Sequence, residues 1–169
     1  MIEIRLESVG EAAAIRQVNE RAFARQNEAN LVDALRDSGE FIISMVALDE
    51  GQIVGHILFS PILIESSEGA KEAMGLGPVA VLPTSQGHGI GSQLVAKGLQ
   101  ACQEAGFTIA VVLGHPAYYP RFGFVPAKPL GIQWEHDVPE DVFMVTALTE
   151  NALAGVKGVV KYHPAFNGV

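Results

Sequence analysis

The segment Gln86-Gly87-His88-Gly89-Ile90-Gly91 joins an apolar extended run to an amphipathic helical pattern. Gly77–Leu82 before it is typical of a strand that ends at Pro83, and residues 89–105 after it repeat apolar side chains at helical spacing. Glycines at the mouth of a helix let backbone N–H groups approach an anion, and the helix dipole favours negative charge there. The segment therefore predicts an anion-binding turn between a strand and a helix.

Two nucleotide-binding motifs do not fit this segment. A P-loop needs a lysine and a hydroxyl residue after its glycines, but the chain continues as Gly91-Ser92-Gln93. A dinucleotide fingerprint needs an acidic residue about 20 positions later at a strand end, where this chain has Ala105–Ile109. Glu104 lies at the expected end of the helix instead, so an NAD-dependent oxidoreductase is disfavoured.

Outward from this turn, alternating and helical patterns predict one α/β domain over residues 1–169, with no repeat or long linker. The expected elements are a strand at 2–6, helices at 11–23 (N-cap Ser8) and 28–38, a hairpin of strands 41–48 and 53–65, a loop at 66–72, a buried strand at 108–113, an irregular stretch at 114–124, strands at 143–148 and 158–162, and a surface tail at 163–169.

The composition limits the partners and the compartment. The 169 residues carry a formal charge of −8, which disfavours nucleic acid and anionic membranes. The chain has one cysteine, Cys102, and no cysteine–histidine cluster, so we expect no disulfide, no metal site and a reducing compartment. No apolar run approaches the roughly 20 residues of a membrane span. These features predict a cytoplasmic protein.

Several motifs together resemble one family. Gln/Arg-x-x-Gly-x-Gly/Ala between a strand and a helix resembles the acetyl-CoA-binding motif of the GNAT (Gcn5-related N-acetyltransferase) superfamily. The order of elements over roughly residues 2–148 also resembles that fold, as does Tyr119-Pro120-Arg121-Phe122-Gly123-Phe124. Tyr118–Phe124, Leu31–Arg36 and Tyr162–Phe166 are similar to the YhbS-type subgroup of predicted acetyltransferases.

The resemblance implies a GNAT acyl-CoA N-acyltransferase fold, with a single mixed, largely antiparallel sheet flanked by helices and a C-terminal strand and tail over 149–169. It implies that the Val79 amide meets the thioester carbonyl as an oxyanion donor and that Tyr119 protonates the leaving thiolate as general acid. The residues implied to bind acetyl-CoA are Val79, Val81, Gln86, Gly87, His88, Gly89, Ile90, Gly91 and Ser92.

Three roles stay open at the level of sequence. Tyr118 competes with Tyr119 as the acid, because neighbouring residues of an extended chain face opposite ways. Many relatives carry a glutamate four residues before the oxyanion donor, but this chain has Gly75 there, which leaves His56, His115 or a water-mediated path as the base. The family's asparagine upstream of the tyrosine is also absent, because Val112 occupies its position.

The sequence favours transfer of an acetyl group from acetyl-CoA to a primary amine of a small molecule or protein. The missing glutamate and asparagine keep a non-catalytic acyl-CoA-binding or sensing module as the alternative. The acceptor would be chosen by the loops expected at 26–30, 66–72 and 126–135, where Glu28 could bind an amine but is expected to be an exposed helix-start carboxylate. Exposed strand edges leave a homodimer open.

Overall fold

The computed structural model describes residues 1–169 and divides the chain into two compact units. The first unit comprises Met1–Ser60, Gly77–Gly98 and Pro164–Val169, and the second comprises Pro61–Leu76 and Leu99–His163. Three elements, β3 (Gln52–Ser66), β4 (Gly69–Val81) and α3 (Ile90–Glu104), pass from one unit into the other. Each unit is described in turn.

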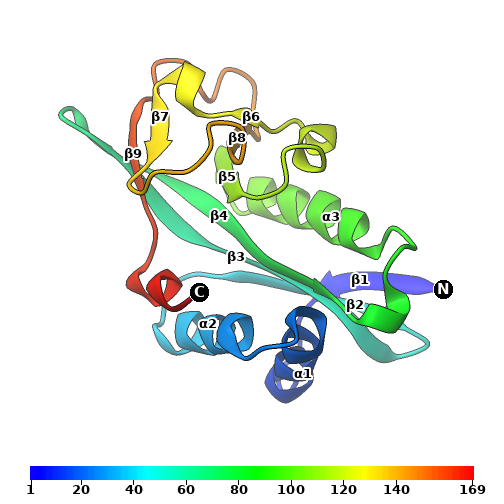
Figure 1. Ribbon diagram of the computed structural model, residues 1–169. Coiled ribbons are helices and arrows are strands. Elements are labelled where there is room, and N and C mark those ends of the chain that lie inside the picture. Colours follow the sequence, from blue (N-terminus) through cyan, green and yellow to red (C-terminus); the bar gives the residue numbers. More distant parts are fainter. The chain divides into compact units, whose positions relative to one another are not determined.

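The first unit packs helices on both faces of its strands (Figure 1). Its elements are β1 (Ile2–Leu6), α1 (Ala12–Phe23), α2 (Asn27–Asp37), β2 (Ile43–Asp49), the start of β3, the end of β4, η1 (Pro83–Ser85), the start of α3 and η4 (Pro164–Gly168). Strand β2 pairs antiparallel with both β1 and β3. Ile15, Leu35 and Leu58 belong to one core cluster beneath α1 and α2.

The opposite face of β3 receives α3 at a site built around Gly98. A Cβ atom at Gly98 would lie 2.2 Å from Cε1 of Phe59, so only a glycine lets the helix approach this ring. Leu94 reaches Gly55 on the same strand, where an added Cβ would lie 3.1 Å from its Cδ1. This close packing fixes the first turns of α3, and with them the glycine-rich turn that precedes the helix.

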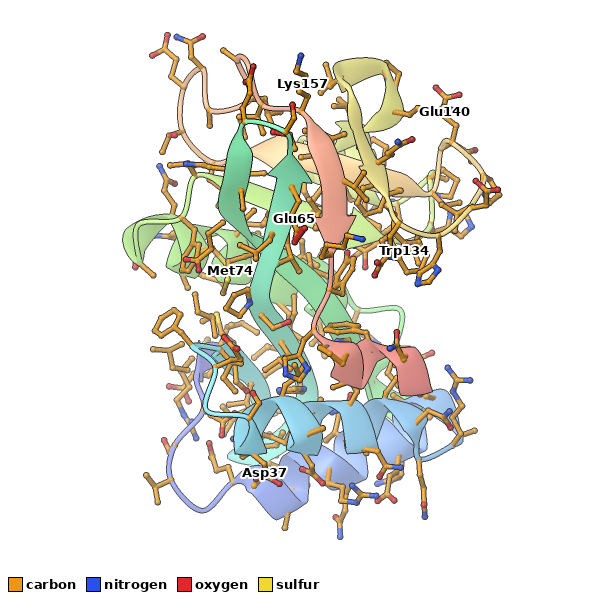
Figure 2. The ribbon with its side chains drawn as sticks, turned by 90° about the vertical axis from the view of Figure 1, so that its left-hand side faces the viewer. Asp37, Glu65, Met74, Trp134, Glu140 and Lys157 are labelled. Carbon is orange, nitrogen blue, oxygen red and sulfur yellow. The ribbon has the colours of Figure 1, made fainter.

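The second unit is an aromatic-rich assembly of short strands. It contains the end of β3, the start of β4, the end of α3, β5 (Ile109–Leu113), η2 (Tyr119–Phe122), β6 (Val125–Pro126), η3 (Lys128–Leu130), β7 (Ile132–Trp134), β8 (Phe143–Ala147) and β9 (Gly158–Lys161). Strand β5 pairs parallel with β4 and antiparallel with β8. Strand β9 lies beside β3, where Glu65 faces Val159 (Figure 2).

The hydrogen-bonded strand order is β1-β2-β3-β4-β5-β8-β6, and β9 pairs with both β3 and β7. The β4–β5 and β7–β9 pairs are parallel, whereas β1–β2, β2–β3, β3–β9, β5–β8 and β6–β8 are antiparallel. The predicted fold class, a single mixed and mainly antiparallel sheet with helices, is therefore confirmed. No helix combines the length and the apolar character that a membrane crossing requires.

Three local predictions are wrong. Residues 66–72 are not a loop, because β4 begins at Gly69 and so starts eight residues earlier than the predicted Gly77. Their polar side chains are exposed, and the strand forms there because its backbone hydrogen bonds do not depend on side-chain polarity. The sequence also does not predict the short strands β6 and β7.

The predicted N-cap of α1 is the second error. The cap residue is Glu11 rather than Ser8, and it makes no side-chain cap bond. The Ser8 N–H donates to Glu11 Oε1 at 2.6 Å, while Arg5 Nη2 holds Glu11 Oε2 at 2.7 Å. Because this ion pair lowers the Glu11 pKa to about 2, the carboxylate stays charged and fixes the turn in place of the serine hydroxyl.

The third wrong prediction concerns the C-terminal tail. The sequence predicts only a surface segment, but Ala165 and Phe166 pack against the core cluster of the first unit. Asn27 Nδ2 also donates to the Gly168 carbonyl at 3.0 Å. The apolar Phe166 explains the difference, because burying an aromatic ring stabilises the docked tail.

Candidate active site

The glycine-rich turn between β4 and α3 has the shape of an anion cradle. Gly87 and Gly89 have φ of +81° and +78°, conformations that a side chain rarely adopts. A Cβ atom added at either position would meet nothing within 4 Å, so the space above the turn is open. The turn is exposed from Gln86 to Gly89, whereas Ile90 is buried and anchors the helix start.

Side chains of the turn hold its own backbone. Gln86 Nε2 donates to the Val81 carbonyl at 3.0 Å, which links the turn to the end of β4. The His88 Nδ1–H donates to the Ser85 carbonyl at 3.3 Å, because that oxygen can only accept. The Gln86 side chain, which the resemblance implies to be part of the cofactor site, makes this contact within the protein.

The strand before the turn offers main-chain groups. The parallel register of β4 with β5 covers Met74–Leu76, so Val79 and Val81 lie beyond it, and both are half-buried. A pantetheine arm that binds like an added strand needs main chain of this kind. The open glycine turn and this strand end fit a CoA pyrophosphate and pantetheine, and they belong to the same unit.

Tyr119 lies in a tightly packed aromatic group of the second unit. Its ring makes edge contacts with Phe124 and Tyr118 at centroid distances of 5.8 and 5.1 Å. A Cβ atom at Gly114 would lie 2.3 Å from Tyr119 Cε2, so this glycine makes room for the ring. Burial raises the pKa of Tyr119 to about 12, and the phenol therefore keeps its proton at neutral pH.

Tyr118 has a different environment. The Arg121 guanidinium lies 4.4 Å above its ring centroid, and Arg121 Nε donates to the Tyr118 carbonyl at 2.9 Å. This cation–π contact and the edge contact with Phe122 restrain the Tyr118 ring. The two tyrosines are thus distinct: Gly114 makes space for one, and Arg121 stacks on the other.

His56, one of the two histidines considered as the base, is completely buried. Asn19 Nδ2 lies 3.1 Å from Nδ1, and Ser44 Oγ lies 2.9 Å from Nε2. Because the Asn19 amide also donates to the Ile15 carbonyl, Nδ1 is the acceptor and Nε2 carries the proton. Burial, with the Arg36 charge as a second cause, lowers the His56 pKa to about 3, so the ring is neutral and unsuited to accept a proton.

The other candidate, His115, is exposed next to the tyrosines. Its Nδ1 accepts a hydrogen bond from the Ala117 main-chain N–H at 3.2 Å. The neutral ring therefore carries its proton on Nε2, and its only free lone pair is already used. His56 is therefore unsuited to act as the base, and His115 and the water-mediated path remain the alternatives.

Gly75 and Val112, where the family pattern is broken, are both in the core of the second unit. A Cβ atom at Gly75 would lie 2.8 Å from Cε1 of Tyr162 and 3.0 Å from Cγ2 of Ile62. The Tyr162 ring thus covers this position of the strand, and burial raises the pKa of Tyr162 above its usual range. Val112 is 1% exposed in β5 and pairs with Met144, so it packs in the core.

The expectation that Glu28 is an exposed carboxylate is wrong. It is only 6% exposed and forms an ion pair with Arg25, whose Nε donates to Glu28 Oε1 at 2.9 Å. The hydrogen bonds from Arg25 lower the Glu28 pKa. The segment expected to be an acceptor loop at 26–30 instead opens α2 at Asn27.

No group of three or more histidine, cysteine, aspartate or glutamate side chains is placed to hold a metal ion. Cys102 is buried, and this burial raises the pKa of its thiol to about 12. A thiol that stays protonated is a poor nucleophile.

Comparisons with known proteins agree with this geometry. A family model described as "Acetyltransferase (GNAT) domain" matches residues 3–127. The N-acetyltransferase YhbS of Escherichia coli K12 is 38% identical over 165 residues, which cover 97% of this chain and 98% of YhbS. The N-acetyltransferase YjhQ of the same strain is 37% identical over 145 residues, covering 82% of this chain and 80% of YjhQ.

Two solved structures are also similar. The E. coli YhbS structure in complex with CoA has a TM-score of 0.91 at 37% identity, covering 98% of this chain and 92% of YhbS. A GNAT acetyltransferase from Brucella melitensis in complex with acetyl-CoA has a TM-score of 0.79 at 40% identity, covering 98% of each chain. The chain therefore belongs to the GNAT family of N-acetyltransferases.

Proposed function

We propose that this N-acetyltransferase transfers an acetyl group from acetyl-CoA directly to a primary amine. The observation that carries the proposal is the open glycine turn at Gly87 and Gly89, at the start of α3 and directly after β4. Relatives that cover almost the whole chain bind CoA and acetyl-CoA, which supports the same cosubstrate here.

Within this proposal, the main-chain amides from Gly87 to Ser92 hold the pyrophosphate, and Val81 holds the pantetheine arm. The Val79 N–H donates to the thioester oxygen as negative charge develops there. The amine nitrogen forms a bond to the acetyl carbon, and the carbon–sulfur bond breaks. The leaving thiolate takes the Tyr119 proton, the proton lost by the amine passes to water, and water returns a proton to the Tyr119 phenolate.

The raised Tyr119 pKa has two consequences for this step. A phenol with a pKa of about 12 is always protonated at neutral pH, as a donor must be. It is also a weaker acid than free tyrosine and than a free thiol, whose pKa is about 8.5, so the transfer requires that the same burial desolvates the leaving thiolate and makes it more basic. Tyr119 therefore acts late, as the carbon–sulfur bond breaks.

The direct test is release of free thiol from acetyl-CoA across a panel of primary amines. Turnover that needs an amine and produces one acetylated amine per thiol supports transfer. A protein that binds acetyl-CoA in the turn but releases no thiol with any amine would instead be the acyl-CoA-binding or sensing module. A cytoplasmic location and a homodimer stay predictions from the sequence.

A further inference from the structure

The aromatic segment at residues 114–124 contains one arginine, Arg121, to which the acetyl-transfer step gives no role. Its guanidinium lies 4.4 Å from the centroid of the Tyr118 ring, and its Nε donates to the Tyr118 carbonyl at 2.9 Å. Arg121 is exposed, and none of the ion pairs of the chain involves it. The guanidinium is therefore engaged by the ring and the main-chain oxygen of a single residue.

Two neighbours of the Tyr119 ring are fixed by the rest of the second unit. Phe124, which meets this ring edge-on at 5.8 Å, is only 1% exposed. Gly114, whose added Cβ would lie 2.3 Å from Tyr119 Cε2, is held by its N–H, which donates to the Val142 carbonyl at 2.9 Å. These two contacts do not depend on Arg121.

Two other neighbours of the Tyr119 ring are only half-buried. Tyr118 meets it edge-on with the ring centroids 5.1 Å apart, and Phe122 lies at 6.4 Å. Tyr118 also contacts Phe122 at 5.4 Å. Because burial fixes neither of these rings completely, their positions depend on further contacts. Tyr118 touches both of the other rings and is itself held by Arg121, so the guanidinium restrains this part of the Tyr119 environment.

Arg121 also holds the peptide bond that joins Tyr118 to Tyr119. The N–H of this peptide belongs to Tyr119 and donates to the His115 carbonyl at 3.4 Å, an oxygen that also accepts from the Tyr118 N–H at 3.1 Å. The carbonyl of the same peptide accepts from Arg121 Nε at 2.9 Å. This bond is both shorter and charge-assisted, and charge-assisted hydrogen bonds are the stronger kind. The orientation of the peptide, and with it the direction in which the Tyr119 side chain leaves the backbone, therefore depends on Arg121.

We propose that Arg121 is a positioning residue for the general acid. Its guanidinium holds the ring and the carbonyl of Tyr118, and Tyr118 in turn holds the Tyr119 phenol in the orientation from which it donates its proton. The inference rests on the function proposed above, in which Tyr119 protonates the leaving thiolate. Because Arg121 acts through Tyr118, its loss should slow proton donation and leave the binding of CoA unchanged.

The first test measures kcat for thiol release and the affinity for CoA in Arg121→Ala. We expect kcat to fall about five- to thirtyfold, because a displacement of a catalytic group by about 1 Å can cost roughly 100-fold. The affinity for CoA should stay within about twofold, as expected when only the reaction step is affected. Arg121→Lys keeps a cation for the Tyr118 ring but loses the Nε donor, so it should recover part of the rate. Lys128→Ala is the matched control, because Lys128 is an exposed cation of the same unit outside the aromatic segment, and it should keep the wild-type kcat.

Two double variants separate positioning from a general loss of structure. Arg121→Ala added to Tyr119→Phe should cause no further loss of kcat, because no phenolic proton is left to position. Added to Tyr118→Phe, it should cost the same factor as on its own, because Arg121 holds the ring and the carbonyl of Tyr118 and not its hydroxyl. An equal loss in both backgrounds would overturn the proposal. A loss of CoA affinity with kcat unchanged would also overturn it and would make Arg121 a ligand of CoA.

Tyrosine NMR tests the same contacts without acetyl-CoA. The chain has three tyrosines, so selective ¹³C labelling gives ring signals from Tyr118, Tyr119 and Tyr162 alone. Arg121→Ala should move the signals of Tyr118 and Tyr119 and leave those of Tyr162 in place, whereas Lys128→Ala should leave Tyr118 and Tyr119 unchanged. A Tyr119 signal that does not move in Arg121→Ala would overturn the proposal even in an active transferase.

The failure of the proposed function has a different signature. If the signals of Tyr118 and Tyr119 move in Arg121→Ala but the wild-type protein releases no thiol with any amine, the contacts of Arg121 stand and the transferase is contradicted. The positioning role is then overturned together with the function on which it rests.

Discussion

The glycine turn at residues 86–92 and the aromatic segment at 114–124 build their sites in opposite ways. The turn presents backbone amides, and its two left-handed glycines face open space. The aromatic segment presents side chains, and Gly114 is needed there because a ring fills the space beside it. From this difference we expect cofactor binding to depend on backbone conformation in the turn, and proton donation to depend on side-chain packing in the aromatic segment.

The largest effect is expected from Tyr119→Phe. Removing a general acid typically costs about 10²- to 10⁴-fold in rate, and CoA affinity should stay within about twofold because the turn is untouched. The measurement is kcat for thiol release together with CoA binding by calorimetry. Tyr118→Phe is the matched control and should keep most of its rate. If Tyr118→Phe loses its rate and Tyr119→Phe keeps most of its rate, Tyr118 is the acid.

Gly114→Ala should have the next largest effect. The added methyl group would lie 2.3 Å from the Tyr119 ring and must displace it. Misplacing a catalytic group by about 1 Å can cost roughly 100-fold. We expect a lower kcat with unchanged CoA affinity, and no further loss when Gly114→Ala is added to Tyr119→Phe. Additive losses in the double variant would mean that Gly114 acts on something other than the tyrosine.

Gly89→Ala tests the cofactor-binding turn, whereas the two preceding variants test the aromatic segment. A left-handed conformation costs an alanine about 1–2 kcal/mol, and its methyl group would stand where the pyrophosphate approaches. We expect CoA affinity to fall roughly 10- to 30-fold. Gly39→Ala is the matched control, because Gly39 has a φ of +79° and equally open surroundings but lies outside the turn. It should lose similar stability without losing CoA affinity.

The last prediction concerns stability and not acetyl transfer, through the buried His56 of the first unit. Its pKa is about 3 in the folded protein and near 6.5 unfolded, so the unfolded chain binds the extra proton between these values. The contribution to stability is complete above pH 6.5 and falls by at most about 1.4 kcal/mol per pH unit below it. His56→Gln should flatten this dependence in denaturant unfolding.

The exposed His115 provides the control for that measurement. His115→Gln leaves His56 and its partners Asn19 and Ser44 in place, so it should keep the part of the pH dependence that comes from the His56 ring. If His56→Gln and His115→Gln behave alike, the ring of His56 titrates normally and its burial has been misjudged.

The sequence predicts the cofactor-binding half of the molecule better than the rest. Periodicity marks β1, α1, α2 and α3 to within a residue or two at nearly every end, because each buries one face and hides the apolar side chains of that face. The turn at Gly87 and Gly89 is visible because positive φ demands glycine. These features are local, so a local pattern suffices to find them.

The parts that the sequence does not predict depend on contacts between distant residues. Nothing near Gly75 indicates that Tyr162, almost ninety positions later, fills the space beside it. The bonds of His56 to Asn19 and Ser44 likewise join three separate elements. The segment from Lys128 to Phe143 has too few residues per strand for periodicity to show, so β7 appears only in the structure.

A crystal structure with acetyl-CoA bound is the most direct test of the proposed cosubstrate site. We predict pyrophosphate oxygens within hydrogen-bond distance of the main-chain N–H groups from Gly87 to Ser92, with the thioester oxygen at the Val79 amide. A pyrophosphate that makes no contact with this turn would contradict the account.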